Sequence, residues 1–303
     1  MHKKILTLLV ILLIIPASFV FSQDQLFLQR HAPYLRPQQD DLTNGTKTAT
    51  YQPILGIGDK DAEKLRGIAR YGALTVDPGG TSAIVSYPAE EQIYFILEGN
   101  GTLLYDSQKV PVKKNDFMYL HIGVKHGISN SSNQPVRLLV MGYRIPQGTE
   151  VKPTPKLMIA NADDVELHLA QGHPPCALFQ LLMGRIGSTR QDGIIYKVTA
   201  TNQVSELFII DLVPGGTNNP HQHPREEEIY YVLQGNGIMV AGLDANGNDL
   251  RHPCVKGDVY YFAPGTRVGF FSFAKEGDAH DQILSVRSSD PTAPPKQQRK
   301  PKE

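Results

Sequence analysis

Two stretches of sequence decide the fold. Residues 78–101 read PGGTSAIVSYPAEEQIYFILEGNG, and residues 214–237 read PGGTNNPHQHPREEEIYYVLQGNG. They align without a gap at an offset of 136 residues, and 13 of their 24 positions are identical. A repeat with this offset is a duplicated domain, because solenoid units repeat every roughly 20–50 residues. The chain of 303 residues is therefore predicted to hold two related domains of about 120 residues each.

The residues inside each repeat are typical of β-strands. Ile93–Leu97 and Ile229–Leu233 are β-branched and aromatic, and a Gly-Asn-Gly turn follows each of them closely. Further strands are expected at Thr102–Tyr105, Asp116–Leu120, Val136–Tyr143, Ile238–Val240, Asp258–Phe262 and Gln282–Val286. Many short strands at this spacing predict an all-β protein of antiparallel barrels or jelly rolls. A few short helices are also expected, at Asp61–Arg70 after Asp59 and at Ala162–Ala170 after Asn161.

The first residues resemble an export signal. His2, Lys3 and Lys4 precede an apolar run to Phe21, and Val20-Phe21-Ser22 is an acceptable cleavage site. An uncleaved membrane anchor is the alternative, but Pro16 interrupts the run. We expect a secreted or periplasmic protein that has no membrane contact after cleavage. Lys+Arg 30 and Asp+Glu 30 balance, so nothing attracts the chain to nucleic acid.

The predicted segments follow from these features. They are a signal peptide (1–22), an N-terminal arm (23–54), a first domain (55–150), a second domain (151–290) and a disordered basic tail (291–303). The two cysteines, Cys176 and Cys254, are open to two interpretations, a disulfide or free buried thiols.

The second repeat carries the residues with metal chemistry. Alternate residues of a strand share a face, so His221 and His223 project together, and Glu228 opens the next strand and can point back at them. Two imidazoles and one carboxylate form a facial triad that leaves coordination positions open. The first repeat has Val85, Tyr87 and Gln92 at the aligned positions and so lacks the triad. We predict one metal site, built from His221, His223 and Glu228.

This pattern resembles the first signature of the cupin superfamily. Gly215, His221, His223, Glu228 and Gly235 stand in the matching places, and residues 257–268 resemble the second signature. The resemblance implies two tandem double-stranded β-helix barrels (RmlC-like jelly rolls), the second of which binds one divalent metal ion: Mn, Fe, Ni, Co or Zn. It also implies that a homodimer could form by exchange of edge strands.

The chain departs from that pattern at the last ligand. The family's usual third histidine is replaced by Val268, and His280 and Gln282 are the candidates to take its place. In the first repeat His126 keeps the late position, but without the early ligands we expect a hydrogen-bonded histidine there. We assign His31, His168, His173 and His252 to the surface or to loops.

Two kinds of function fit these residues. The first is a metal-dependent enzyme, a dioxygenase, a decarboxylase or similar, acting on a small organic molecule, although no catalytic acid or base is identifiable. The alternative is a non-catalytic cupin that binds or senses a small molecule or sugar. The missing fourth ligand and the altered first repeat favour the alternative, and the open metal positions favour the enzyme.

Overall fold

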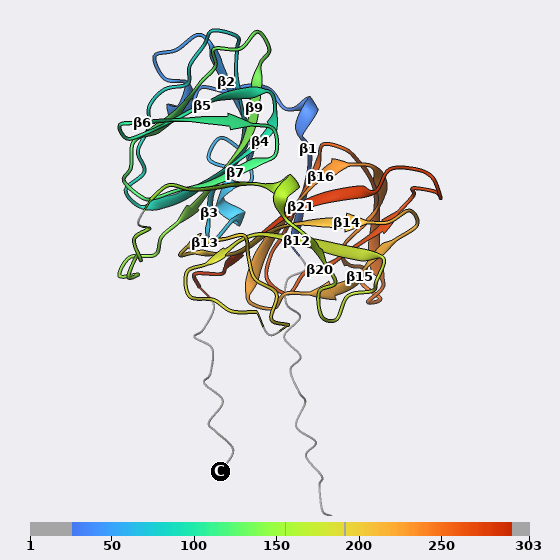
Figure 1. Ribbon diagram of the computed structural model, residues 1–303. Helices are drawn as coiled ribbons and strands as arrows, with labels where there is room; N and C mark the ends of the chain where they lie inside the picture. The colour runs from blue at the N-terminus through green and yellow to red at the C-terminus, as the bar shows by residue number, and fades with distance from the viewer. Residues whose placement is uncertain (1–25, 155, 191, 293–303) are drawn as a thin grey trace, which may run out of the picture.

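The computed structural model describes residues 26–154, 156–190 and 192–292, and these form two β-barrels side by side (Figure 1). The barrels confirm the all-β prediction. The predicted signal peptide, residues 1–22, and residues 293–303 of the predicted tail lie outside the described residues. Among the residues described, no helix is long and apolar enough to cross a membrane.

The first barrel packs a larger sheet against a smaller one. The larger sheet has the strand order β10 (Met158–Asn161), β7 (Asp116–Leu120), β4 (Glu90–Glu98), β9 (Val136–Arg144), β3 (Ile68–Val76) and β2 (Ala49–Gly56). The smaller sheet has the order β6 (Gln108–Lys113), β5 (Asn100–Tyr105) and β8 (His126–Ser129). Their inner faces bury aliphatic and aromatic side chains, including Leu74, Tyr94 and Leu103.

The second barrel repeats this arrangement. Its larger sheet has the order β1 (Phe27–His31), β19 (Asp258–Phe262), β16 (Glu226–Gln234), β21 (Asp281–Ser289), β14 (Val204–Leu212), β12 (Ala177–Arg185) and β11 (Leu167–His168), with β13 (Val198–Thr201) paired to β12. Its smaller sheet has the order β15 (Thr217–Gln222), β20 (Arg267–Ser272), β17 (Asn236–Leu243) and β18 (Asp249–Val255). The predicted strands Asp116–Leu120 and Asp258–Phe262 match β7 and β19 residue for residue.

Each barrel lends an edge strand to the other. The strand β1 comes from the N-terminal arm but pairs with β19, so that Leu28 faces Tyr261 in register. In the same way β10, which follows the first barrel in sequence, returns to pair with β7. This exchange covers two sheet edges that would otherwise be open to pairing with another chain.

The contact between the barrels is largely apolar and contains two buried carboxylates. A single hydrophobic cluster draws residues from both larger sheets, among them Phe117 and Tyr261. Within it, Glu227 accepts hydrogen bonds from the backbone amides of Arg66 (2.7 Å) and Gly67 (2.6 Å). Glu91 does the same for residues 202–204 of the second domain. Residues 202 and 203 are the repeat equivalents of residues 66 and 67, because the offset between them is the repeat length of 136. Each domain therefore supplies one glutamate that binds equivalent backbone amides of the other domain.

The predicted helices are wrong. The segment after Asp61 forms a single 3-10 turn, Ala62–Lys64, and strand β3 begins at Ile68. The side chain of Asn161 does cap a turn, but that turn is only Ala162–Asp164. Two further 3-10 turns, Ala32–Tyr34 and Asp41–Thr43, lie in the N-terminal arm. A capping residue favours only the first turn of a helix, and here the chain enters a β-strand or an extended segment within a few residues of each turn.

Both cysteines are free thiols. Cys254 is buried, and burial raises the pKa of its thiol to about 12. Of the two interpretations that the sequence allows, the structure supports the free thiols.

Candidate metal centre

The two histidines of the predicted triad come from the end of one strand. His221 lies on β15, and His223 follows directly after it, before a turn at Pro224 leads into β16. Their Nε2 atoms face each other at 2.9 Å. The Nδ1 atom of His221 lies 2.8 Å from the carbonyl oxygen of Asn219, so in the neutral ring Nδ1 carries the proton and Nε2 presents a lone pair.

His223 is neutral. Burial, and then the charge of Arg287, lowers the pKa of its imidazole to about 2. A neutral imidazole is the form that binds a metal ion. The contact between their Nε2 atoms shows that the two rings project to the same side, as the sequence predicts.

Glu228 lies at the start of β16 with 1% of its surface exposed. Its Oε1 atom accepts a hydrogen bond from Ser285 at 2.9 Å and lies 3.2 Å from Nε of Arg287. Its Oε2 atom is buried, has no hydrogen-bond donor in the described chain, and lies 3.5 Å from Nε2 of His223. Burial raises the pKa of the Glu228 carboxyl, while Arg287 opposes this shift.

Two of the separations between these three side chains match those between the ligands of one metal ion. Ligands about 2.1 Å from one metal lie roughly 3.0–3.5 Å apart, and the two measured separations are 2.9 and 3.5 Å. An unpaired buried carboxylate oxygen is costly and is what a cation would satisfy. In the region described, however, no group of three or more His, Cys, Asp and Glu side chains is arranged so that it could hold a metal ion. The imidazole nitrogens contact each other, and one carboxylate oxygen is held by Ser285 and Arg287.

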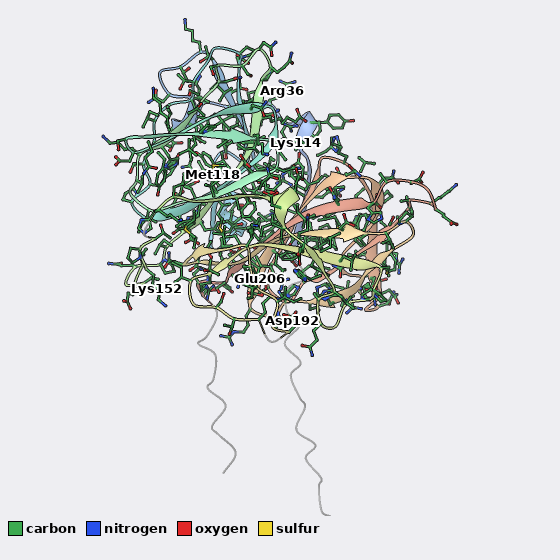
Figure 2. All side chains as sticks on the ribbon, viewed as in Figure 1. Arg36, Lys114, Met118, Lys152, Asp192 and Glu206 are labelled. Atoms are coloured by element: carbon green, nitrogen blue, oxygen red, sulfur yellow. The ribbon has the colours of Figure 1, made fainter. Side chains whose placement is uncertain are left out.

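An ion-pair network behind Glu228 was not foreseen from the sequence. Arg287, on β21, contacts Glu228 and, through a second nitrogen at 2.9 Å, Glu206 on β14. Glu206 also binds Arg190, which in turn pairs with Asp192; Glu206 and Asp192 are labelled in Figure 2. Burial disfavours the charge of Arg287, yet the two carboxylates raise the pKa of its guanidinium.

His173, expected at the surface or in a loop, does lie in a loop, but this loop reaches the site. Its ring packs edge-on against His221 with centroids 5.7 Å apart and against Phe179 at 4.6 Å. Burial, and then His221, lowers the pKa of His173. No spacing pattern in the sequence indicates His173, because it precedes His221 by 48 residues.

The candidates for a fourth ligand lie elsewhere. Val268 is buried and stands opposite His221 in the β15–β20 pair, where it offers no ligand atom. His280 and Gln282 both bind Asp211, at 2.5 and 2.9 Å, near the other end of β21 from Arg287.

The first barrel replaces the triad with a guanidinium. Arg70 occupies the strand position of Glu206 and packs over the ring of Tyr87 at 4.3 Å, while pairing with Asp41 at 2.8 Å. Gly142 stands in register where the second barrel has Arg287, and a Cβ at Gly142 would lie 2.6 Å from Cγ of Arg70. Each barrel thus holds one arginine at this position, contributed by a different strand.

The other first-barrel positions behave as the sequence suggested. Val85 and Tyr87 are buried among apolar residues, and Gln92 donates a hydrogen bond to Glu90 at 2.9 Å. His126 is a single buried imidazole whose Nδ1 lies 2.9 Å from the carbonyl oxygen of Val124. Burial lowers its pKa to about 4, so it is neutral.

Comparison with known proteins agrees with the fold. The family model described as "Cupin domain" matches residues 72–142 and 208–280, one match in each barrel. An uncharacterized protein of Methanocaldococcus jannaschii is 33% identical over 79 residues, which are 26% of this chain and 63% of that protein. A germin-like protein of Arabidopsis thaliana, subfamily 2 member 2, is 37% identical over 82 residues, 26% of this chain and 36% of its own length. The chain thus matches less than two thirds of the length of these relatives.

Solved structures resemble both barrels together. The protein Ylba of E. coli superposes with a TM-score of 0.63, 14% identity and coverage of 92% of this chain and 97% of that one. Oxalate decarboxylase of Lactobacillus farciminis superposes with a TM-score of 0.61, 12% identity and coverage of 87% and 86%. At such identities the likeness shows the fold alone. With a cupin match in each repeat and two jelly-roll barrels, the chain belongs to the cupin superfamily as a two-domain bicupin.

Proposed function

We propose that the second barrel binds one divalent metal ion through His221, His223 and Glu228, and that the protein is a metal-dependent enzyme acting on a small organic molecule. The observation that carries the proposal is the free Oε2 atom of Glu228 beside the neutral imidazole of His223, whose Nε2 atom contacts that of His221. A bound metal ion would supply Lewis acidity at open coordination positions. Mn, Fe, Ni, Co and Zn all accept such ligands.

The protein groups around the triad have separate tasks in this proposal. Ser285 and Arg287 hold Oε1 of Glu228 and so direct Oε2 toward the histidines. Tyr230 and Phe262 pack edge-on in the buried interior and exclude water from that side. His173 is the side chain best placed to add a nitrogen ligand or to meet a substrate, because its ring contacts that of His221.

The reaction class that we propose is that of a dioxygenase, a decarboxylase or similar. Oxalate decarboxylases among the structures of the same fold make oxalate a first substrate to test. The non-catalytic binding protein stays the second candidate, and one observation favours it: one carboxylate oxygen of Glu228 is already bound by an arginine. We also propose export, on the basis of residues 1–22 alone.

Metal content tests the site. The purified chain is incubated with Mn, Fe, Ni, Co or Zn, freed of excess metal and analysed by mass spectrometry for metal. We expect about one ion per chain. His221→Ala combined with His223→Ala should bind none, and His168→Ala, a histidine on β11 outside the triad, should bind as the wild type does. Equal loading of all three proteins would refute the site.

Turnover distinguishes the two candidate functions. The metal-loaded chain is assayed with oxalate, catechols and quercetin-like compounds while oxygen uptake and product release are recorded. Turnover that is lost in the double variant supports the enzyme. Full metal loading without turnover of any of these classes favours the binding protein.

A further inference from the structure

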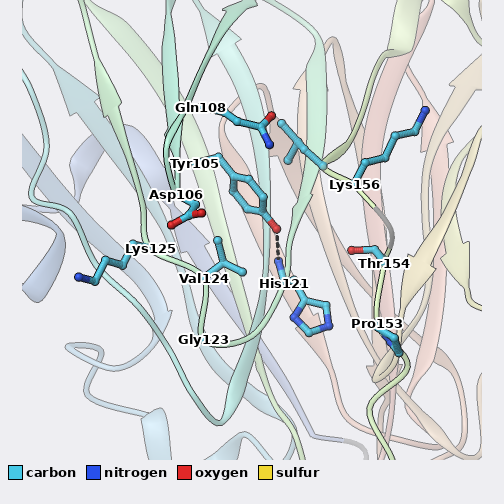
Figure 3. Close-up of a pocket in the computed structure, with 11 residues that line it drawn as sticks. Tyr105, Asp106, Gln108, His121, Gly123, Val124, Lys125, Pro153, Thr154 and Lys156 are labelled. Atoms are coloured by element: carbon cyan, nitrogen blue, oxygen red, sulfur yellow. Dashed lines mark hydrogen bonds between the residues drawn. The ribbon is translucent and has the colours of Figure 1, made fainter.

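A cavity of about 570 Å³ opens at one end of the first barrel, away from the triad (Figure 3). Its walls come from the hairpin that joins β5 and β6, from the loop between β7 and β8, and from the segment before β10. Ligand cavities for small molecules are roughly 300–1,000 Å³, so the volume suits a ligand of monosaccharide size.

Tyr105 and His121 bring a hydroxyl and an imidazole to the lining of this cavity. The hydroxyl oxygen of Tyr105 accepts a hydrogen bond from the backbone amide of His121 at 3.4 Å, so its own proton remains available. The Nδ1 atom of His121 lies 3.0 Å from the carbonyl oxygen of Ile122, so in the neutral ring Nδ1 carries the proton. The Nε2 atom is then an acceptor, and it is buried without a hydrogen-bond partner in the described chain.

The rest of the lining has the same mixed character. Asp106 and Gln108 contribute a carboxylate and an amide, and in Figure 3 the hydroxyl of Thr154 points toward the space beside Tyr105. The ring of Tyr105 is buried in the first barrel and forms part of the apolar wall together with Val124.

The cavity is lined by two lysines and one aspartate. Lys125 and Lys156 line the cavity, but in Figure 3 both side chains extend away from Tyr105 and His121. What remains is an array of adjacent donors and acceptors on a partly apolar wall. Hydroxyl groups both donate and accept, so neighbouring hydroxyls on a small ring complement such an array.

The second barrel does not repeat this pair. Ala241 and Ala263 stand in register where the first barrel has Tyr105 and His121. The barrel fold therefore accepts small side chains at both places, and the polar pair is not required for folding. An unpaired buried acceptor costs about 1–3 kcal/mol, a cost that a ligand hydroxyl would remove.

We propose that this cavity is a binding site for a neutral, polyhydroxylated small molecule of the monosaccharide class, read by Tyr105 and His121. The proposal does not depend on the metal site, which lies in the other barrel.

Saturation-transfer NMR on the purified full-length chain tests this. The probes are the common neutral hexoses and pentoses, with glucuronate and galacturonate as their acidic counterparts. We expect saturable binding of at least one neutral sugar. Affinity should fall by at least about tenfold in Tyr105→Phe and in His121→Ala, since each removes one hydrogen bond to the ligand.

Two controls separate the outcomes. Tyr94→Phe removes another buried hydroxyl of the same barrel that has no partner in the described chain and does not line the cavity, and it should bind as the wild type does. His221→Ala with His223→Ala should also leave sugar binding unchanged, so failure of the metal site cannot imitate failure here. Thermal unfolding of each variant confirms that it is folded.

Three results would overturn the proposal. The first is no saturable binding of any neutral sugar up to tens of millimolar. The second is binding of the uronates alone, which would assign the cavity to anions. The third is binding that persists unchanged in both Tyr105→Phe and His121→Ala.

Discussion

Arg287 and Glu228 face each other in register on neighbouring strands, with Nε of the guanidinium 3.2 Å from Oε1 of the carboxylate. Arg287 also pairs with Glu206, so one partly buried cation contacts both the partly buried Glu206 and the buried Glu228. Removing one member of such a network leaves uncompensated charge in the interior.

The first prediction concerns this balance. Arg287→Met should lower the free energy of unfolding by about 3–5 kcal/mol. Added divalent metal should restore part of the loss, because a cation at Oε2 of Glu228 would again compensate its charge. Urea unfolding with and without metal measures both effects.

Arg251→Met is a matched control for that experiment. Both arginines pack over a phenylalanine ring, at 4.7 Å for Arg287 on Phe208 and 4.6 Å for Arg251 on Phe271. Of these two arginines, Arg287 is the one that pairs with Glu206 and Glu228 in the part of the chain described. Equal losses of stability in the two variants would mean that ring packing, and not charge balance, is the role of Arg287.

The second prediction concerns Glu91 and Glu227, each of which accepts hydrogen bonds from backbone amides of the other barrel. Glu91→Gln and Glu227→Gln should each cost about 1–3 kcal/mol of stability, because an amide cannot accept all the backbone hydrogen bonds that each carboxylate now receives. Glu226→Gln, next to Glu227 but only partly buried, should change stability little. Calorimetry of the three variants checks this. A loss of stability in only one of Glu91→Gln and Glu227→Gln would contradict the equivalence of the two glutamates.

How much of this could be predicted from sequence depends on the range of the interaction. Strands such as β7 and β19 were predicted because their apolar and β-branched residues define them locally. The exchange of β1 could not be predicted, since the arm carries no marker of the sheet that it joins. The predicted helices were wrong because a capping residue such as Asn161 signals a turn but not its continuation.

The candidate site divides in the same way. His221, His223 and Glu228 lie within eight residues, and their spacing indicates the site. Arg287 and Glu206 come from strands far along the chain and meet Glu228 only through sheet register. An arginine in a strand has no local pattern that distinguishes a buried network from a surface charge.

The third prediction concerns pH and the arm over the first barrel. Burial, and then contact with Asp41, raises the pKa of Asp40 to about 7. The folded state therefore holds a proton that the unfolded chain releases near its ordinary pKa of 3.8. Where the folded state binds more protons, stability falls as pH rises, here between about pH 4 and 7.

Asp40→Asn removes this titration while its side chain can still cap the turn through Leu42. Its stability relative to wild type should be more favourable at pH 8 than at pH 5. Burial alone would raise the pKa of Asp41, but hydrogen bonds with Asp40 and Arg70 lower it to about 2, so Asp41 does not titrate in this window. Urea midpoints at both pH values test the difference, and parallel pH profiles for the two proteins would disprove it.

The last prediction concerns the strand that the arm lends to the second barrel. Removing residues 1–31 would delete β1 and with it the buried side chain of Leu28. It would also remove the contact of 2.7 Å between Nδ1 of His31 and the carboxylate of Asp258. The edge of β19 would then be open along five paired residues. An open edge invites pairing with another chain, so the shortened protein should unfold at a lower temperature and elute as dimers or larger species. Removing residues 1–25 leaves β1 intact and serves as the control, measured by light scattering after size exclusion. If both shortened proteins elute alike and melt alike, β1 does not protect that edge.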